Sequence, residues 1–208
     1  MDLGEKSISL GGNHNKRGER PLKYFKKIVG ERLYLSPINI EDVEKYTEWV
    51  NDLSVTINLS LSPYIFSLEK EKETLEKLSK EGYNFSIVSL SKDELIGNCG
   101  LLGVDHINRT AEAGIFIGDK KYWNKGYGTE AMNLLLDYAF NLLNLNSIFL
   151  RVHSFNKRAI KCYEKCGFKE MGVRREAYIV GNKKYDQIYM DILASEFNGK
   201  IQNIIDES

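Results

Sequence analysis

The sequence has little of what would tie a protein to a membrane, a nucleic acid or a metal. Lysine plus arginine and aspartate plus glutamate both total 29, so the formal net charge at pH 7 is zero. No overall field would attract nucleic acid or an anionic membrane surface. No apolar run reaches the roughly 18 residues that a membrane-spanning helix needs. We therefore expect neither nucleic acid nor membrane among the partners.

Cysteine is also scarce, with three residues in the chain. Cys162 and Cys166 share one face of an expected helix, whereas Cys99 is distant, and no paired cysteine or histidine motif completes a zinc set. The odd number of cysteines favours reduced, buried thiols over disulfides. The amino terminus also lacks the basic-then-apolar pattern of a secretion signal. These observations predict a cytoplasmic protein without a metal.

The chain divides into three segments by composition. Residues 1–29 form a basic N-terminal extension whose stretch NHNKRGERPLKYFKK holds six lysines and arginines against one glutamate. We interpret it as a solvated arm, with contact to a phosphate-bearing partner as the alternative. The chain as a whole is 42% hydrophobic and of ordinary domain length, and residues 30–197 are expected to form one α/β domain. Residues 198–208 are the C-terminal tail.

Periodicity predicts seven strands and four helices in the order β-α-α-β-β-β-α-β-α-β-β. The helices begin after Asn39, after Ser67, near Thr129 and after Asn156, and Gly82 and Gly167 end the second and fourth of them. The strands are read in the segments ERLYLSPI, YNFSIVSL, LIGNCGLLGV, AEAGIFIG, SIFLRV, FKEMGVRREAYI and KYDQIYMDIL. The fold class is therefore α/β in the broad, α+β sense.

A glycine-rich loop joins the fourth strand to the third helix. Gly126, Gly128 and Thr129 stand where the helix should begin, and the unpaired N–H groups of a helix amino terminus attract anions. A tight turn without a ligand is the alternative. The loop of nucleoside-triphosphate enzymes is excluded, because no Gly-Lys followed by Ser or Thr occurs in the chain.

The dinucleotide fingerprint is a closer rival for the same loop. Its bare spacing is met by Gly126, Gly128 and Ala131. However, the preceding strand ends near Gly118, about seven residues too early, and the next strand ends in Arg151 and His153 where a ribose-binding acid belongs. A nicotinamide enzyme is therefore disfavoured.

The stretch from about residue 31 to 193 resembles the GNAT acetyltransferases. The resemblance is carried by AEAGIFIG, YWNKGYGTEA and FNKRAIKCYEKCGF. In that family a loop Gln/Arg-x-x-Gly-x-Gly/Ala binds the pyrophosphate of acetyl-coenzyme A. Trp123 stands where glutamine or arginine is usual, a departure common in the branch of ribosomal-protein N-terminal (RimJ/RimL-like) and spermidine acetyltransferases. The resemblance implies a mixed, mostly antiparallel sheet, splayed between the fourth and fifth strands, with acetyl-CoA as co-substrate.

The resemblance also implies which residues line the cofactor groove. The pantetheine arm would lie along Phe116, Ile117 and Gly118, where a backbone N–H would stabilise the oxyanion. The remaining expected contacts are Trp123, Lys125, Gly126, Tyr127, Gly128, Thr129, Asn156 and Ala159. Tyr122 and Trp123 form an aromatic pair that either stacks on the nucleotide or packs the loop.

Tyr163 lies seven residues after Asn156, on the same helical face. The resemblance makes Tyr163 the acid that protonates the departing sulfur, while Asn156 anchors the pantetheine arm or a water. The alternative is a core tyrosine and a plain helix cap. The base is more open: Glu112, His153 and Asp119 fall near the ends of the splayed strands, and a water chain would also serve. Glu112 is our prediction.

The implied reaction is transfer of acetyl from acetyl-CoA to a primary amine by direct attack. The acceptor is expected to be a protein amino terminus, such as that of a ribosomal protein, or a small amine. Polyamine or aminoglycoside acetylation and a non-catalytic acyl-CoA-binding module are the alternatives, and a homodimer is left open. The acceptor pocket is expected between the first two helices and residues 174–186. There the acids Glu48, Asp52, Glu176 and Asp186 either attract a cation or are surface charge.

Overall fold

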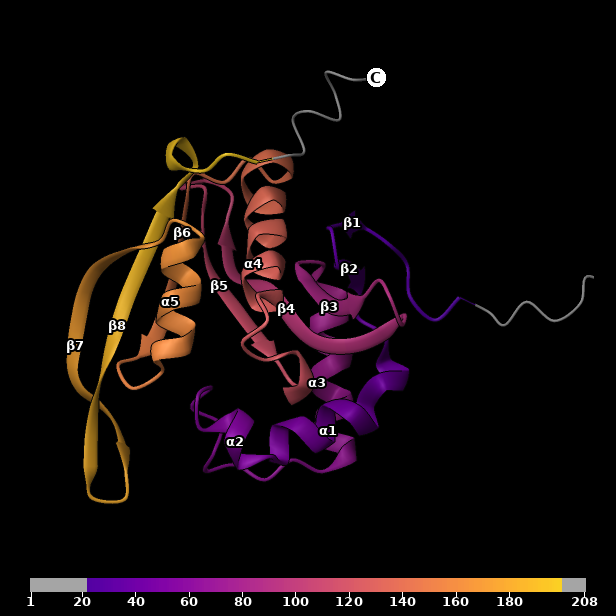
Figure 1. Ribbon diagram of the computed structural model, residues 1–208, viewed down its shortest axis with the longest axis horizontal. Coiled ribbons are helices and arrows are strands. Elements are labelled where there is room, and N and C mark those ends of the chain that lie inside the picture. Colours follow the sequence, from indigo (N-terminus) through magenta and orange to yellow (C-terminus); the bar gives the residue numbers. More distant parts are fainter. Residues whose placement is uncertain (1–21, 200–208) are drawn as a thin grey trace, which may run out of the picture.

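The computed structural model describes residues 22–199, and its centre is one sheet of eight strands in the order β1-β2-β3-β4-β5-β6-β8-β7 (Figure 1). The strands are β1 Ile28–Val29, β2 Leu33–Pro37, β3 Asn84–Ser89, β4 Glu94–Asp105, β5 Thr110–Ile117, β6 Ser147–His153, β7 Lys169–Val180 and β8 Lys183–Leu193. The helices are α1 Val43–Asn51, α2 Leu53–Thr56, α3 Leu68–Glu81, α4 Tyr127–Asp137 and α5 Lys157–Lys165. All neighbouring strands are antiparallel except β5 and β6, which confirms the predicted mixed sheet.

The two parallel strands separate soon after they begin. β5 and β6 pair only from Thr110 with Ser147 to Glu112 with Phe149. Beyond these pairs, β5 runs on to Ile117 and β6 to His153 with no register between them. The predicted splay between these strands is therefore confirmed, and the free edge of β5 faces the gap.

Helices cover both faces of the sheet. Alternate residues of β2 enter different cores, because successive side chains of a strand point to opposite faces. Leu33 and Leu35 belong to the core that contains the apolar side of α4, whereas Tyr34 packs in the second core with residues of α1 and α3. Figure 1 shows α4 and α5 together in front of the sheet. These two helices flank the gap between β5 and β6.

The predicted helix boundaries follow local capping chemistry. The Ser67 side chain accepts a hydrogen bond from the Lys70 N–H at 3.2 Å, and Gly82 ends α3 in the left-handed region at φ +80°. Asn156 caps α5 in the same way. Asn39 caps a 3-10 turn, Ile40–Asp42, that leads into α1. The short helix α2 was not expected, and α4 continues as a π-helical turn, Tyr138–Leu142.

The folded part begins earlier than the predicted boundary at residue 30. Tyr24 and Ile28 are buried, and the Tyr24 hydroxyl donates to Asp42 Oδ1 at 3.1 Å. β1 is an eighth strand that was missed because two residues carry no periodic signal. Residues 1–21 and 200–208, which hold most of the predicted extension and tail, lie outside the described residues. No helix between residues 22 and 199 is long and apolar enough to cross a membrane.

Candidate active site

A cavity of about 720 Å³ occupies the gap between β5 and β6. Its walls come from these strands, from the loop before α4, from α5 and from the segment that follows α2. The predicted site residues that line it are Glu112, Phe116, Ile117, Trp123, Gly126, Tyr127, Gly128, Thr129, Asn156, Ala159 and Tyr163. Segments that are distant in the sequence thus meet at one hollow.

Two predicted cofactor residues do not line this cavity. Gly118 lies under the indole of Trp49, so close that an added Cβ would be 2.1 Å from the ring, and its N–H donates to the Ile96 carbonyl. Gly118 therefore lets α1 pack against the end of β5. The Lys125 carbonyl accepts a hydrogen bond from Arg32 Nη1 at 2.7 Å. The direct cofactor contacts expected of Gly118 and Lys125 therefore stay predictions.

The glycine-rich loop places the amino terminus of α4 at the cavity. Gly126 is the N-cap, in the left-handed region at φ +84°, and no side chain caps the helix. The first N–H groups of α4 are thus available to an anion. At Gly128 an added Cβ would meet the protein at ordinary distances, 3.7 Å from Cys162 Sγ at the nearest. The fold itself does not demand glycine at Gly128, so its small size leaves space for a ligand.

An arginine at the start of β2 binds this loop from outside. Arg32 Nε donates to Glu130 Oε2 at 2.8 Å, its Nη1 reaches the Lys125 carbonyl, and its guanidinium lies 4.7 Å from the centre of the Tyr127 ring. The Arg32 main-chain N–H donates to the other Glu130 oxygen at 2.8 Å. We call these contacts the Arg32 clasp. They order the residues on both sides of Gly126.

The aromatic pair before the loop divides between two roles. Trp123 lines the cavity, donates from Nε1 to the Ile117 carbonyl at 2.6 Å, and carries the Arg158 guanidinium 3.9 Å above its ring. The Tyr122 ring is buried, and its hydroxyl donates to Glu94 at 2.5 Å. Tyr122 therefore packs the loop, and it also lines the cavity beside Trp123.

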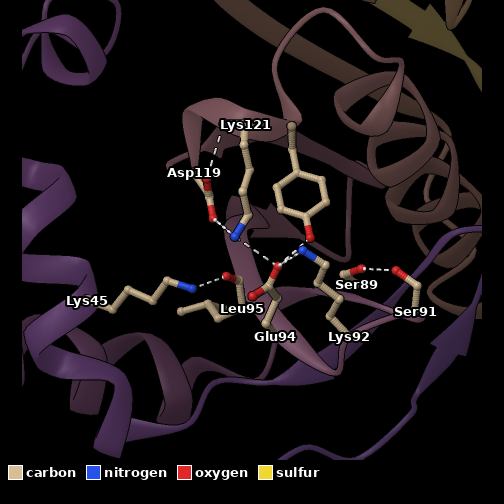
Figure 2. A network of polar contacts seen from close by, with 9 residues as sticks. Lys45, Ser89, Ser91, Lys92, Glu94, Leu95, Asp119 and Lys121 are labelled. Carbon is tan, nitrogen blue, oxygen red and sulfur yellow. Dashed lines mark hydrogen bonds and ion pairs between the residues drawn. The ribbon is translucent and has the colours of Figure 1, made fainter.

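A charged network fixes the segment between β5 and this loop (Figure 2). Lys121 lies between two carboxylates, 3.0 Å from Glu94 and 3.1 Å from Asp119, and Lys45 contacts the Leu95 carbonyl. The Asp119 side chain also accepts from the Lys121 N–H, so it caps the turn. Asp119 does not line the cavity, so the structure does not support its candidacy as the base.

Tyr163 lies in the wall formed by α5. Its side chain is 9% exposed and its ring packs against Phe168 at 5.9 Å between centroids. Burial, the largest cause, raises the pKa of Tyr163 well above its usual value. The hydroxyl therefore keeps its proton at neutral pH. Asn156 caps α5 by accepting from the Ala159 N–H at 3.2 Å, so at least the plain capping role holds.

The whole arrangement agrees with comparisons to known proteins. Residues 32–169 match the family described as Acetyltransferase (GNAT) domain. The chain belongs to the GNAT family. It is an acetyl-CoA-dependent N-acetyltransferase, as the resemblance implied.

Several GNAT relatives cover most of the chain. An uncharacterised N-acetyltransferase of Bacillus licheniformis is 31% identical over 173 residues, 81% of this chain and 97% of the relative. Spermidine N(1)-acetyltransferase of Vibrio cholerae is 33% identical over 157 residues, 70% of this chain and 90% of that protein. The crystal structure of spermidine N-acetyltransferase from Vibrio cholerae in complex with CoA and spermine has a TM-score of 0.73 at 28% identity, covering 80% of this chain and 98% of that one.

Two groups of this GNAT cavity are candidates for accepting the amine proton. Arg151 donates to both oxygens of Glu112, at 2.7 and 3.0 Å. His153 Nε2 lies 2.7 Å from Ser60 Oγ, and the imidazole stacks on Phe155 and Tyr178. Burial lowers the pKa of His153, and its Nδ1 has no hydrogen-bond partner among the described residues. Both side chains line the cavity, each already bound on one side.

One part of the cavity is lined by the segment after α2 and by β6, with Gln187 of β8, and there we expect the acceptor. The acids that we expected there are engaged elsewhere: Asp52 contacts Lys120 at 2.5 Å and Glu176 contacts Lys184 at 2.6 Å. Asp186 accepts from the Glu176 N–H. Asp52 and Glu176 are thus paired with lysines, Asp186 is bonded to an uncharged main-chain N–H, and Glu48 is exposed.

Tyr178 packs behind this part of the cavity, where its ring stacks on that of His153. The Tyr178 hydroxyl lies 3.0 Å from Ser62 Oγ and donates to the Ile57 carbonyl at 3.4 Å, which joins β7 to the segment after α2. The sequence did not single out Ser60 or Tyr178. Within residues 22–199, no group of three or more histidine, cysteine or acidic side chains could hold a metal ion.

Proposed function

We propose that this GNAT enzyme transfers acetyl from acetyl-CoA to the primary amine of a protein amino terminus or of a small molecule, by direct attack on the thioester. The observation that carries the proposal is the single cavity that joins the free edge of β5, the amino terminus of α4 and Tyr163. Each of these features meets one need of the reaction. The free edge of β5 offers backbone groups to the thioester, the amino terminus of α4 offers an anion site, and Tyr163 offers a proton.

The cofactor would lie along the gap between β5 and β6. Its pyrophosphate would take hydrogen bonds from the N–H groups around Gly128 and Thr129, where the positive end of α4 adds to the attraction. The pantetheine arm would then follow β5 past Ile117 and Phe116. The solved Vibrio cholerae relative with CoA and spermine supports a cofactor site in this fold.

Tyr163 would protonate the departing sulfur. When the amine attacks, the carbonyl oxygen gains negative charge, which a backbone N–H of the β5 edge would stabilise. Collapse of this intermediate breaks the carbon–sulfur bond and leaves CoA as a thiolate. The raised pKa of Tyr163 keeps its hydroxyl protonated until that moment.

Glu112 remains our proposed acceptor for the amine proton. Its carboxylate lines the cavity, and the two hydrogen bonds from Arg151 fix its orientation. Each carboxylate oxygen keeps a second lone pair beside its bond to Arg151, so Glu112 can take the proton from the amine directly or through a water. Asn156 and Ala159 would contact the pantetheine arm from the α5 side.

Two of the four expected acids are paired within the protein. Asp52 and Glu176 form ion pairs with lysines, which leaves less negative charge to recognise a polycation, so we favour an amine without a second charge. Polyamines are the second candidate, because relatives at 33% and 28% identity are named spermidine acetyltransferases. The two candidate acceptors differ in whether the molecule carries further positive charges besides the reacting amine.

A panel of acceptors decides between these functions. CoA thiol release would be measured with amino-terminal peptides, monoamines, spermidine, spermine and aminoglycosides, using wild type and Tyr163→Phe. Turnover confined to peptides or monoamines supports the first candidate. Spermidine as the best acceptor by kcat/KM would replace it with the second. Acetyl-CoA binding without turnover on any acceptor would indicate a non-catalytic binding module.

A further inference from the structure

Two cysteines of α5 meet the first turn of α4. Cys162 and its C-cap residue Cys166 are four residues apart and so lie on one helical face. The Thr129 hydroxyl donates to Cys162 Sγ at 3.3 Å, and the Cys166 S–H points to the Thr129 carbonyl at 3.6 Å. Both sulfurs therefore contact the residue that follows Gly128 in the glycine-rich loop.

The two sulfurs differ in access to the cavity. Cys162 is partly exposed and lines the cavity, and its Sγ is 3.7 Å from the position of an added Cβ on Gly128. Cys166 is buried behind it. Cys99, on β4, is fully buried and does not line the cavity. Cys162 is thus the accessible thiol and Cys166 its buried neighbour. Cys99 serves as a control for the reactivity of a buried cysteine.

The surroundings of Cys162 favour its thiolate. The neighbouring Cys166 is the largest cause that lowers the pKa of Cys162, and it outweighs burial, which raises it. The Thr129 hydroxyl and the positive charges of Lys165 and Arg158 also lower this pKa. Burial raises the pKa of Cys99, and the contact with Cys162 raises that of Cys166. A thiolate in an accessible, positively charged site beside a second cysteine is typical of redox-sensitive cysteines.

We propose that Cys162 is a thiol-modification site that controls entry of acetyl-CoA, with Cys166 as its resolving partner. The Cys162 thiolate attacks a low-molecular-weight disulfide, a new sulfur–sulfur bond forms, and one thiolate leaves and takes a proton from water. Cys166 then loses its proton to solvent and attacks the Cys162 sulfur, which releases the second thiol. Two protein thiols are oxidised to one disulfide while the small disulfide is reduced to two thiols.

The geometry allows the second step at the end of α5. Residues four apart in a helix have Cα atoms about 6 Å apart, within the range that disulfides span, although their Cβ atoms must approach by about 1 to 2 Å. Cys166 follows the last helical residue, Lys165, and Gly167 takes a left-handed conformation at φ +95°. A helix end can rearrange in this way without disturbing the turns before it.

Modification would obstruct the cofactor at the glycine-rich loop. A group attached to Cys162 Sγ would occupy the space beside Gly128 and displace the Thr129 hydroxyl. This consequence rests on the proposed position of the pyrophosphate, whereas the thiol chemistry does not. Acetyl-CoA should in turn shield Cys162 from the reagent.

The test treats the reduced full-length protein with glutathione disulfide and follows it by intact mass and peptide mapping. The wild type should form the Cys162–Cys166 disulfide, and Cys166→Ser should stop at a glutathione adduct on Cys162. Acetyl-CoA at ten times its Kd should slow both by about tenfold, because only the free protein reacts. Loss of turnover should parallel modification and reverse with dithiothreitol.

Controls separate the thiol chemistry from the cofactor position. Cys99→Ser should react like the wild type, and whatever activity Cys162→Ser has should be the same before and after treatment. Modification mainly at Cys99, or an unchanged rate at Cys162 under saturating acetyl-CoA, would overturn the inference. In the second case the acceptor panel would still test the proposed function, because it does not depend on Cys162.

Discussion

Replacing Arg32 with alanine tests whether the loop before α4 is ordered in advance for the cofactor. The side chain loses its bond to Glu130, its bond to the Lys125 carbonyl and its stacking on Tyr127. The Arg32 main-chain N–H still donates to Glu130, so the loop keeps one anchor. Because the side chain is 46% exposed, solvent weakens each of the lost contacts.

The expected size follows from ordinary values for such contacts. An exposed ion pair contributes about 0.5 kcal/mol, a hydrogen bond about 1 kcal/mol and an exposed cation–π contact about 0.5 kcal/mol. If between half and all of the roughly 2 kcal/mol orders the loop for binding, KM for acetyl-CoA should rise about five- to thirtyfold. The rate at saturating acetyl-CoA should change much less, because Arg32 does not line the cavity that holds Tyr163.

Steady-state kinetics of CoA thiol release, with acetyl-CoA varied, measure this effect. Arg32→Lys keeps the charge but loses the planar fork, so its KM should fall between those of wild type and Arg32→Ala. Glu130→Gln removes the ion pair from the other side and keeps an acceptor for the main chain. An unchanged KM in a folded Arg32→Ala protein would refute the ordering role. A large drop in melting temperature with an unchanged KM would assign Arg32 to stability alone.

Three further changes test the site and the fold. Tyr163→Phe should lower the single-turnover rate by about a hundredfold or more with little change in cofactor affinity. Full activity would mean that water, and not Tyr163, protonates the departing sulfur. Gly128→Val should abolish acetyl-CoA binding by calorimetry in a protein that still folds, since its Cβ fits the protein but obstructs a ligand; unchanged affinity would remove the loop from the site. Burial raises the pKa of Glu71 to about 7 from an ordinary 4.5, so its protonation stabilises the fold below pH 4.5 and this contribution is lost as pH rises through 7. The melting temperature of Glu71→Gln minus that of the wild type should therefore be larger at pH 8 than at pH 5. An equal difference at both pH values would contradict this.

The sequence predicted features that depend on local patterns. Ser67, Gly82 and Asn156 are caps because neighbouring residues leave unpaired backbone groups, which any reader of the sequence can locate. The resemblance predicted the splayed strands, and it predicted that Tyr163 lies near the glycine-rich loop. Tyr163 and this loop line the same cavity. Local chemistry and family likeness therefore accounted for most of the sheet and for most of the expected residues that line the cavity.

Features that depend on tertiary contact could not be read in advance. Arg32 and Glu130 are 98 residues apart, and nothing at either position marks them as partners. The Ser60 hydroxyl bonds His153 across 93 residues, and Gly118 packs under the indole of Trp49. The acids expected on the acceptor side were residues of the right type, but lysines or main-chain groups of the protein itself engage three of them. Charge pairing of this kind depends on packing and is invisible to composition.

The splay also divides the sheet into two blocks. Only the three register positions from Thr110 to Glu112 join β1–β5 to β6–β8 through strand pairing. A cofactor lying along the free edge of β5 would bridge the blocks and stabilise the native chain by RT ln(1 + [L]/Kd). Resistance to heat and to proteases would then follow the supply of acetyl-CoA, so that a cell short of this metabolite would lose the enzyme as well as its substrate.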